Sequence, residues 1–280
     1  MTTPQHLLYK LTWEEALQAA REHRVVLVPV GAIEQHGPHL PLDVDNLLAV
    51  TLCEEAARRN AELLACAMHI PYGYNAHNMG FPGTVSIRQQ VFIDYCFDVC
   101  ASYAQHGFHY LLLINAHGSN HHLCEAIARQ VSMQTSARCG MLSWWNLVPD
   151  VIQGFRESAY PGGVSHACEV ETSLYQHIAP ADVRQDKITK EIAWNVGKYW
   201  YKDFVGGGAL SYTSYHHEFS HSGVAGDPTV ATPEKGRQLL EAFCERLPEL
   251  AREFRDIVDH PRYTELPTVS LTPAREGQGR

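Results

Sequence analysis

The sequence predicts a single α/β domain in which a mainly parallel central sheet is sandwiched between helix layers. Residues 25–30 and 110–115 are short, continuous apolar runs, which suit strands buried on both faces of a parallel sheet. Amphipathic stretches alternate with such runs along the chain, as in successive βαβ units. The 280 residues, 45% of them hydrophobic and 19% charged, can form one large core. We therefore expect one domain over residues 1–260, followed by a poorly ordered polar tail over residues 261–280.

Periodicity and boundary signals place the individual elements. A first helix is expected over residues 12–23, because Thr12 and Glu15 have the spacing of a capping box. Strands are expected over residues 25–30, 63–70, 110–115 and 140–144. Further helices are expected over residues 46–59, 89–105, 123–132, from about 166 onward, and 233–259. Residues 71–86 form a long loop rich in Gly and Asn, and a loop of this length in a compact domain is usually functional.

The composition excludes several classes of function. A formal net charge of −9 and the lack of any Lys/Arg-rich run argue against a nucleic-acid partner. No run of 18 apolar residues occurs, and the first twenty residues lack the apolar centre of a signal peptide, so we expect a cytoplasmic protein with no membrane partner. The eight cysteines include no C-x-x-C pair and are expected to be reduced core thiols. A small molecule is the expected substrate.

Metal-type side chains gather where the first apolar strand ends. Within twelve residues the chain carries Glu34, His36, His39, Asp43 and Asp45. Open α/β sheets bind ligands just outside the carboxyl ends of their strands, which is where this group falls. Asp45 stands at the start of the next predicted helix, where a carboxylate is stabilised, although Asp43 is an alternative to it as a ligand. His39 is expected to order the loop by hydrogen bonding.

Two later segments supply further candidate ligands. His117 directly follows the strand over residues 110–115. His166 and Glu169 are three residues apart and would share a helix face, which favours Glu169 over Glu171 unless the helix starts later. The expected ligands are Glu34, His36, Asp45, His117 and Glu169. Three carboxylates and two imidazoles are too many for one catalytic ion, but they suit two divalent cations that share a carboxylate. Zn²⁺ and Mn²⁺ are the expected metals, with Fe²⁺ and Co²⁺ as alternatives.

Several motifs, in this order and spacing, resemble the creatininase (creatinine amidohydrolase) family. They are GAIEQHGPHLPLDVD, the H-x-x-x-FPGT of residues 77–84, NAHGSN, HACEVETS and GVAGDPTVATPEKG. The resemblance covers about residues 25–235 and implies a parallel sheet between helix layers, a two-metal hydrolytic centre and a homo-oligomer, often a hexamer built as a trimer of dimers. It implies that Glu34, Asp45 and His117 hold one ion, and that His36, Asp45 and a further carboxylate hold the other. His166 matches the family histidine proposed to shuttle the proton.

The chain departs from creatininase itself at Ser119, where that enzyme has a glutamate two residues after the strand-end histidine. Many relatives instead carry a glutamate in the HAGExETS segment, and Glu169 fits that place. Creatinine is therefore not the expected substrate. The resemblance implies an amidohydrolase in which a metal-bridged hydroxide attacks the carbonyl of a cyclic amide or formamide, with His166 and Glu169 as catalytic residues.

Two other functions compete with this expectation. The same metal centre could hydrolyse a C–C bond of a cyclic diketone in sugar or inositol breakdown, since only the leaving atom differs. A non-enzymatic metal-binding protein is the third alternative, and it leaves His166 without a purpose. His121 and His122 are expected to be structural. The part that other polar and aromatic residues take in the pocket stays open: His77, Trp144, Trp145, His216, His217 and His221.

Overall fold

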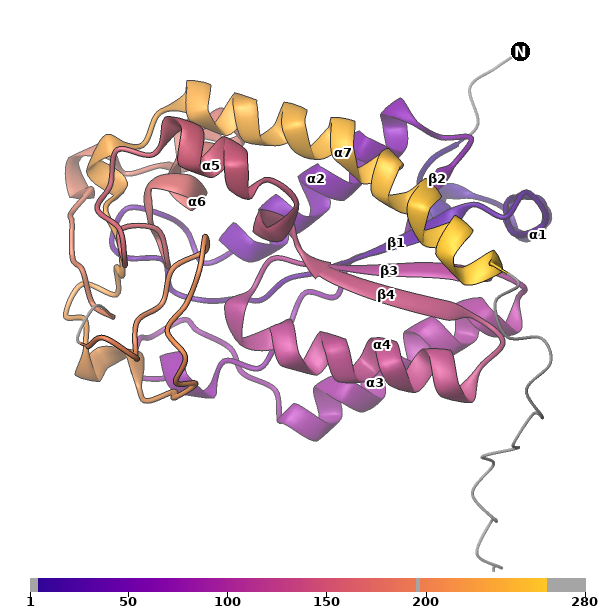
Figure 1. Ribbon diagram of the computed structural model, residues 1–280, viewed down its shortest axis with the longest axis horizontal. Coiled ribbons are helices and arrows are strands. Elements are labelled where there is room, and N and C mark those ends of the chain that lie inside the picture. The colour runs from indigo at the N-terminus through magenta and orange to yellow at the C-terminus, as the bar shows by residue number, and fades with distance from the viewer. Residues whose placement is uncertain (1–4, 195–196, 261–280) are drawn as a thin grey trace, which may run out of the picture.

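The computed structural model describes residues 5–194 and 197–260 and has a central sheet of four parallel strands (Figure 1). The strands lie in the order β2-β1-β3-β4. Their bounds are β1 Val25–Val30, β2 Leu64–Cys66, β3 Tyr110–Asn115 and β4 Arg138–Ser143. Every residue of the two central strands, β1 and β3, is buried. This double-sided burial explains why both strands read as unbroken apolar runs.

Helices cover both faces of this sheet. They are α1 Trp13–Arg21, α2 Val44–Arg59, α3 Gln89–Gln105, α4 His121–Gln134, α5 Pro149–Phe155, α6 Glu169–Ile178 and α7 Pro233–Asp259. Figure 1 shows α2, α5, α6 and α7 on one face and α3 and α4 on the other, and α1 packs into the same core as α3 and α4. Alternate residues of β1 pack into the two cores. Val25 and Leu27 pack on the side of α2 and α7, and Val26 and Val28 pack on the side of α3 and α4. The α/β prediction is confirmed.

Two predicted boundaries differ from the structure by three or more residues, and the others by two at most. The strand expected over residues 63–70 shortens to three residues, because β2 lies at the edge of the sheet: it pairs with β1 on one side and has only an isolated bridge, between Cys66 and Leu7, on the other. Met68 is 53% exposed, and only Ile70 returns to form an isolated bridge with Val30. The helix expected from His166 starts at Glu169 instead. The tail expected over residues 261–280 lies outside the described residues.

Ala167 is the reason for the later helix start. Its φ of +49° lies in the left-handed region, which an L-residue with a side chain seldom adopts and which a right-handed helix cannot include. The main chain of His166 instead pairs with Ala225, in both directions, at 2.8 and 2.9 Å. The chain before α6 is therefore fixed in a non-helical conformation, and the faces of α6 are set by a start at Glu169.

The end of β1 is packed directly against the start of α2. A Cβ added at Gly31 would lie 2.9 Å from both the Cα and the main-chain N of Asn46, so only glycine fits there. The Asn46 amide donates to the carbonyl oxygens of Ala32 and Pro71, at 3.0 and 3.1 Å. These contacts fix the first turn of α2, and with it Asp45, beside the carboxyl ends of β1 and β3.

The cysteines lie inside the two cores. All eight are buried and free, in agreement with the prediction of reduced core thiols. Burial raises the pKa of the Cys53 and Cys124 thiols above the ordinary thiol value. Within the described ranges, no helix has both the length and the apolar character needed to cross a membrane.

Candidate metal centre

Four of the predicted ligands converge on one buried cluster at the carboxyl ends of β1 and β3. The cluster contains Glu34, His36, Asp45 and His117, and Glu171 completes it. Asp45 belongs to two groups of three, one with Glu34 and His117 and the other with His36 and Glu171. Its Oδ2 lies 3.1 Å from His117 Nδ1, whereas its Oδ1 lies 3.4 Å from His36 Nε2. The two oxygens of one carboxylate thus face two different groups.

Main-chain carbonyl oxygens orient both imidazoles. His117 Nε2 lies 3.2 Å from the carbonyl oxygen of Tyr74, and His36 Nδ1 lies 3.1 Å from that of Glu34. A carbonyl oxygen only accepts, so these ring nitrogens carry the proton and donate it. The opposite ring nitrogens, His117 Nδ1 and His36 Nε2, face the carboxylates. This is the arrangement in which proteins present histidine to a metal.

The electrostatics of the cluster call for positive charge. Burial lowers the pKa of His117, but the carboxylates of Glu34 and Asp45 outweigh burial and raise it to about 10. In the same way Asp45 and Glu171 raise the pKa of His36 against the effect of burial. Burial raises the pKa of the Glu34 carboxyl, whereas His36 and His117 hold that of Asp45 well below its ordinary range. Protons on the imidazoles or divalent cations can supply the charge that three buried carboxyl groups require.

The polar atoms of the cluster fit divalent cations. Glu34 Oε2, Asp45 Oδ2 and His36 Nε2 are buried and have no hydrogen-bond partner among the described residues. An unpartnered buried polar atom is costly, and groups of them in folded proteins call for an explanation such as a bound ion. These atoms are carboxylate oxygens and an imidazole nitrogen, the donors that Zn²⁺ and Mn²⁺ accept. The residues present therefore fit a pair of cations that share Asp45.

Glu169, which the sequence predicted as a ligand and catalytic residue, does not join the cluster in the structure. Its carboxylate lies 2.6 Å from Lys235 Nζ and accepts hydrogen bonds from the main-chain N–H groups of Glu157 and Ser158, at 3.1 and 3.0 Å. Residues two apart on a helix point about 200° apart, so Glu169 and Glu171 leave α6 on opposite sides. Because α6 starts at Glu169, it is Glu171 Oε1 that lies 3.8 Å from His36 Nε2.

His166 lies beside the cluster, although it does not share a helix face with Glu169 as expected. Its ring centroid is 4.3 Å from that of His36, and a ring nitrogen lies within 4.8 Å of ligand atoms of Glu34 and His36. Its Nε2 lies 2.8 Å from the carbonyl oxygen of Gln35, so this nitrogen carries the proton and Nδ1 keeps a lone pair. Burial lowers the pKa of His166 well below its ordinary value. The ring is a neutral imidazole with Nδ1 as its basic atom.

Two amide side chains that the sequence did not single out hold the cluster in place. Asn78 donates to Glu34 Oε1, and the Gln35 amide donates to Asn78 Oδ1 at 3.2 Å and to the carbonyl oxygen of Gly223 at 3.0 Å. Asn78 and His77 come from the Gly- and Asn-rich loop that was predicted to be functional. His77 Nε2 lies 3.9 Å from Glu34 Oε1. The length of the loop predicted that it is functional, but the sequence did not indicate which of its asparagines contacts the cluster.

The remaining candidates lie around the cluster. Asp43 accepts a hydrogen bond from the Tyr175 hydroxyl at 3.0 Å and lies outside the cluster, so Asp45 is the candidate ligand of the two. His39 Nε2 is 2.9 Å from Thr172 Oγ1, in agreement with a hydrogen-bonding role. Trp145 stacks on Phe204 with ring centroids 4.5 Å apart. Trp144 and His216 are buried, whereas His217 and His221 are exposed.

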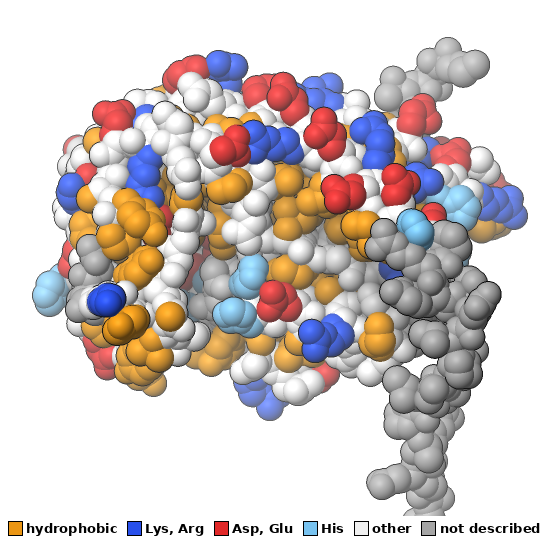
Figure 2. Space-filling view, viewed as in Figure 1, with side chains coloured by type: hydrophobic (Ala, Val, Ile, Leu, Met, Phe, Trp, Pro, Cys, Tyr) orange, Lys and Arg blue, Asp and Glu red, His pale blue; other side chains and the backbone are white. Residues whose placement is uncertain are grey.

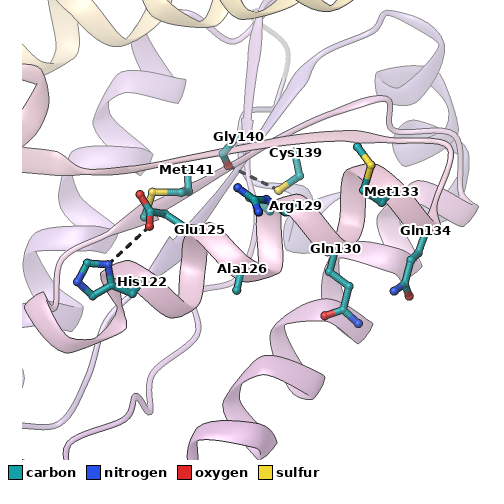
Figure 3. Close-up of a pocket in the computed structure, with 11 residues that line it drawn as sticks. His122, Glu125, Ala126, Arg129, Gln130, Met133, Gln134, Cys139, Gly140 and Met141 are labelled. Atoms are coloured by element: carbon teal, nitrogen blue, oxygen red, sulfur yellow. Dashed lines mark hydrogen bonds and ion pairs between the residues drawn. The ribbon is translucent and has the colours of Figure 1, made fainter.

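An open hollow of about 790 Å³ lies elsewhere, between α4 and the edge strand β4. In Figure 3 His122 and Glu125 point toward one another on α4, with Nδ1 and Oε2 3.6 Å apart, and Met141 faces them from β4. Figure 2 shows histidine and acidic side chains exposed over this helix. None of the residues that line the hollow belongs to the buried cluster. The hollow is therefore separate from the candidate metal centre.

Comparison with known proteins supports the same assignment. The creatinine amidohydrolase family, Creatininase, matches residues 9–251. The chain is 28% identical to a 3-dehydro-scyllo-inosose hydrolase of Thermotoga maritima, over 95% of this chain and 88% of that protein. It is 30% identical to a mycofactocin precursor peptide peptidase of Mycobacterium tuberculosis, over 79% of this chain and 81% of that protein. A creatinine amidohydrolase of Pseudomonas putida is 31% identical over 64% of this chain and 74% of its own length.

Solved creatininase structures have the same fold. A manganese form of creatininase superimposes with a TM-score of 0.77 at 25% identity, covering 89% of this chain and 98% of that one. A zinc–zinc form of a creatininase variant gives the same TM-score, identity and coverage. The resemblance noted in the sequence is confirmed: the chain belongs to the creatininase family and is a hydrolase.

Proposed function

We propose that the protein is a metal-dependent amidohydrolase that cleaves a C–N bond in a small molecule. The observation that carries this proposal is the position of Asp45, whose two carboxylate oxygens face two separate groups of buried ligands. A pair of divalent cations lowers the pKa of bound water and polarises a carbonyl group. The zinc–zinc and manganese forms of creatininase support Zn²⁺ or Mn²⁺ as the cations here.

The residues of this chain then have distinct roles. Glu34, Asp45 and His117 would hold one cation, and His36, Asp45 and Glu171 would hold the other. Asn78 and Gln35 keep Glu34 and the ring of His166 in place through the hydrogen bonds described above.

His166 is the proton carrier in this proposal. It takes up a proton at Nδ1 when water attacks the carbonyl and returns it to the leaving nitrogen. Its neutral state suits this exchange, because a protonated imidazole could not act as the base.

A C–C hydrolase acting on a cyclic diketone is the second candidate. The inosose hydrolase of Thermotoga maritima matches 95% of this chain, more than the peptidase or the creatinine amidohydrolase does. Ser119 stands where creatininase has a glutamate, which supports a different pocket here, and its hydroxyl lies 3.2 Å from His77 Nε2. The same residues would serve this reaction, with carbon in place of nitrogen as the leaving atom.

We also infer that the chain forms a homo-oligomer, a hexamer built as a trimer of dimers. Exposed apolar side chains support this, and Figure 2 shows hydrophobic side chains gathered over the loops that are orange in Figure 1. Tyr199, Leu210, Tyr212 and Tyr215 of these loops are each more than half exposed. Light scattering should give about six times the mass of the chain, and a monomer would refute this state.

Metal analysis and a substrate panel test the proposed function. Protein purified without chelator should contain about two divalent ions per chain. Lactams, formamides and cyclic diketones, assayed with Zn²⁺ or Mn²⁺, identify the bond: release of an amine or ammonia supports C–N cleavage, and a new carboxylate without amine supports the second candidate. His166→Ala should lower turnover at least about a hundredfold while the metal content stays the same. Unchanged turnover would remove His166 from the reaction.

A further inference from the structure

Lys202 is a partly buried cation that lies against the ring of Trp194 and has no acidic partner within salt-bridge distance among the described residues. Its Nζ lies 4.4 Å from the centroid of the Trp194 ring. Burial lowers the pKa of its ammonium group, while the charge of Glu34 opposes this shift. Lys202 in turn lowers the pKa of His77 and His216 below what burial alone gives. It is thus within electrostatic range of a proposed metal ligand.

The loop that carries Lys202 is held in place on its C-terminal side. The neighbouring carboxylate, Asp203, is fully used by Arg156, at 2.7 and 2.9 Å, and by the N–H of Gly162 at 2.8 Å. Phe204 donates its N–H to the carbonyl oxygen of Val164 at 2.9 Å and stacks on a buried tryptophan. These contacts set the position of Lys202 and leave its charge available, because the nearest acid in the sequence is already paired.

His216 adds a second unused polar group, and its ring lies against the same Trp194 ring as Lys202. Its side chain is fully buried, and neither ring nitrogen has a hydrogen-bond partner among residues 5–194 and 197–260. Its ring centroid lies 5.0 Å from that of His166 and 4.7 Å from that of Trp194. A row of rings therefore leads from the metal centre to the indole on which Lys202 lies. Burial, followed by the charge of Lys202, lowers the pKa of His216 to about 3, so this ring is neutral and has one N–H to donate.

We propose that Lys202 and His216 form a subsite for an anionic oxygen group of the substrate, either a carboxylate or an enolate. An ammonium and an imidazole N–H both donate, so their common partner is a negatively charged oxygen acceptor. Trp194 covers one side of the ammonium and limits its hydration, which strengthens attraction to an anion. The inference rests on the proposed function, because it assumes that the reacting bond lies at the metal centre. It names the substrate class as an organic acid: an amide that also carries a carboxylate, or an enolised diketone.

Paired hydroxamic acids test this subsite on the zinc-loaded protein. A hydroxamate binds zinc, so a dicarboxylic acid monohydroxamate places its free carboxylate at a fixed distance from the metal. Each acid, with two to five methylene groups, is compared by calorimetry with an alkyl hydroxamic acid of the same length. At least one acid should bind about tenfold or more tightly than its neutral match. In a parallel arm, dimedone, which is an enolate at neutral pH, is compared with dimethylcyclohexanone to distinguish the enolate from the carboxylate.

Variants assign any preference to the subsite. Lys202→Met should remove the preference and Lys202→Arg should keep most of it, with the zinc content unchanged in both. Lys198→Met is the matched control, because Lys198 lies in the same segment, 5.0 Å above the ring of exposed Tyr199, and should keep the full preference. His216→Phe keeps an aromatic ring but has no N–H, and it should weaken the preference about threefold.

The outcomes separate this inference from the proposed function. If every anionic probe binds the wild type no better than its neutral match, the subsite is refuted while the metal centre stands. A preference that survives Lys202→Met also refutes it. Failure of the protein to bind zinc or any hydroxamate would overturn the proposed function, and this subsite with it.

Discussion

Separate replacement of Glu171 and Glu169 by glutamine tests which carboxylate of α6 serves the metal centre. Glu171 belongs to only one of the two ligand groups, so Glu171→Gln should lower the metal content from about two ions per chain to about one. Glu169 belongs to neither group, and Glu169→Gln should keep both ions. The two variants make the same chemical change two residues apart, so each is the control for the other.

The Glu169→Gln variant should keep its metal but lower the free energy of unfolding. The Glu169 side chain is fully buried, and that of its partner Lys235 is 8% exposed. Removing one member of a buried ion pair costs about 3–5 kcal/mol, because the other charge is left without a partner. Lys235 keeps Glu157 at 2.6 Å and the carbonyl oxygen of Val230 at 2.7 Å, so we expect about 3 kcal/mol, at the lower end of that range.

Plasma emission analysis of the metal content and urea unfolding measure the two effects. Urea unfolding is best carried out with chelator present, so that lost metal does not count as lost stability. Loss of one ion in Glu169→Gln, together with two ions retained in Glu171→Gln, would refute the assignment of Glu171 as the ligand from α6.

Three further perturbations have defined outcomes. Asp45→Asn should abolish binding of both ions, since both groups use this carboxylate, and one ion retained in metal analysis would contradict its shared position. Gly31→Ala should destabilise the fold by about 1–3 kcal/mol in urea unfolding and lower activity, because the new Cβ meets the main chain of Asn46; an unchanged midpoint would contradict the packing of α2 against β1. The pKa of the Glu191 carboxyl is lowered from 4.5 to about 2: burial alone would raise it, but hydrogen-bond donors in residues 220–222 outweigh burial. Its carboxylate therefore adds stability above about pH 4.5 that is lost as the pH falls towards about 2, and Glu191→Gln should reduce the difference in unfolding free energy between these two pH values, whereas an equal difference in variant and wild type would refute this role.

Periodicity and boundary signals predicted the regular elements well. The strand over residues 110–115 and the helices over residues 89–105 and 233–259 have the predicted bounds. The strand is buried throughout, and the buried residues of the two helices recur every three or four positions, so the period of each pattern is clear in the sequence. Thr12 and Glu15 form the expected capping box. The convergence of four ligands was also predictable, because side chains that follow neighbouring parallel strands meet at the same edge of a sheet.

What the sequence did not reveal depends on irregular backbone. The left-handed φ of Ala167 carries no glycine or asparagine signal, so the start of α6, and with it the choice of Glu171, could not be read. Lys202 and His216 lie in segments without helical or strand periodicity, and only tertiary packing brings them beside the centre. The edge position of β2 similarly decides its short length, since its outer side carries only the isolated bridge between Cys66 and Leu7.

The buried thiols offer a practical consequence. A reagent that alkylates thiolates reacts with a cysteine only when the surrounding structure opens, because burial both blocks access and keeps the group protonated. Cys53 and Cys244 lie in the core beneath α2 and α7, whereas Cys96 and Cys124 lie in the opposite core beneath α3 and α4. Mass spectrometry of labelled peptides over time would therefore show whether the two halves of the molecule open together or one before the other.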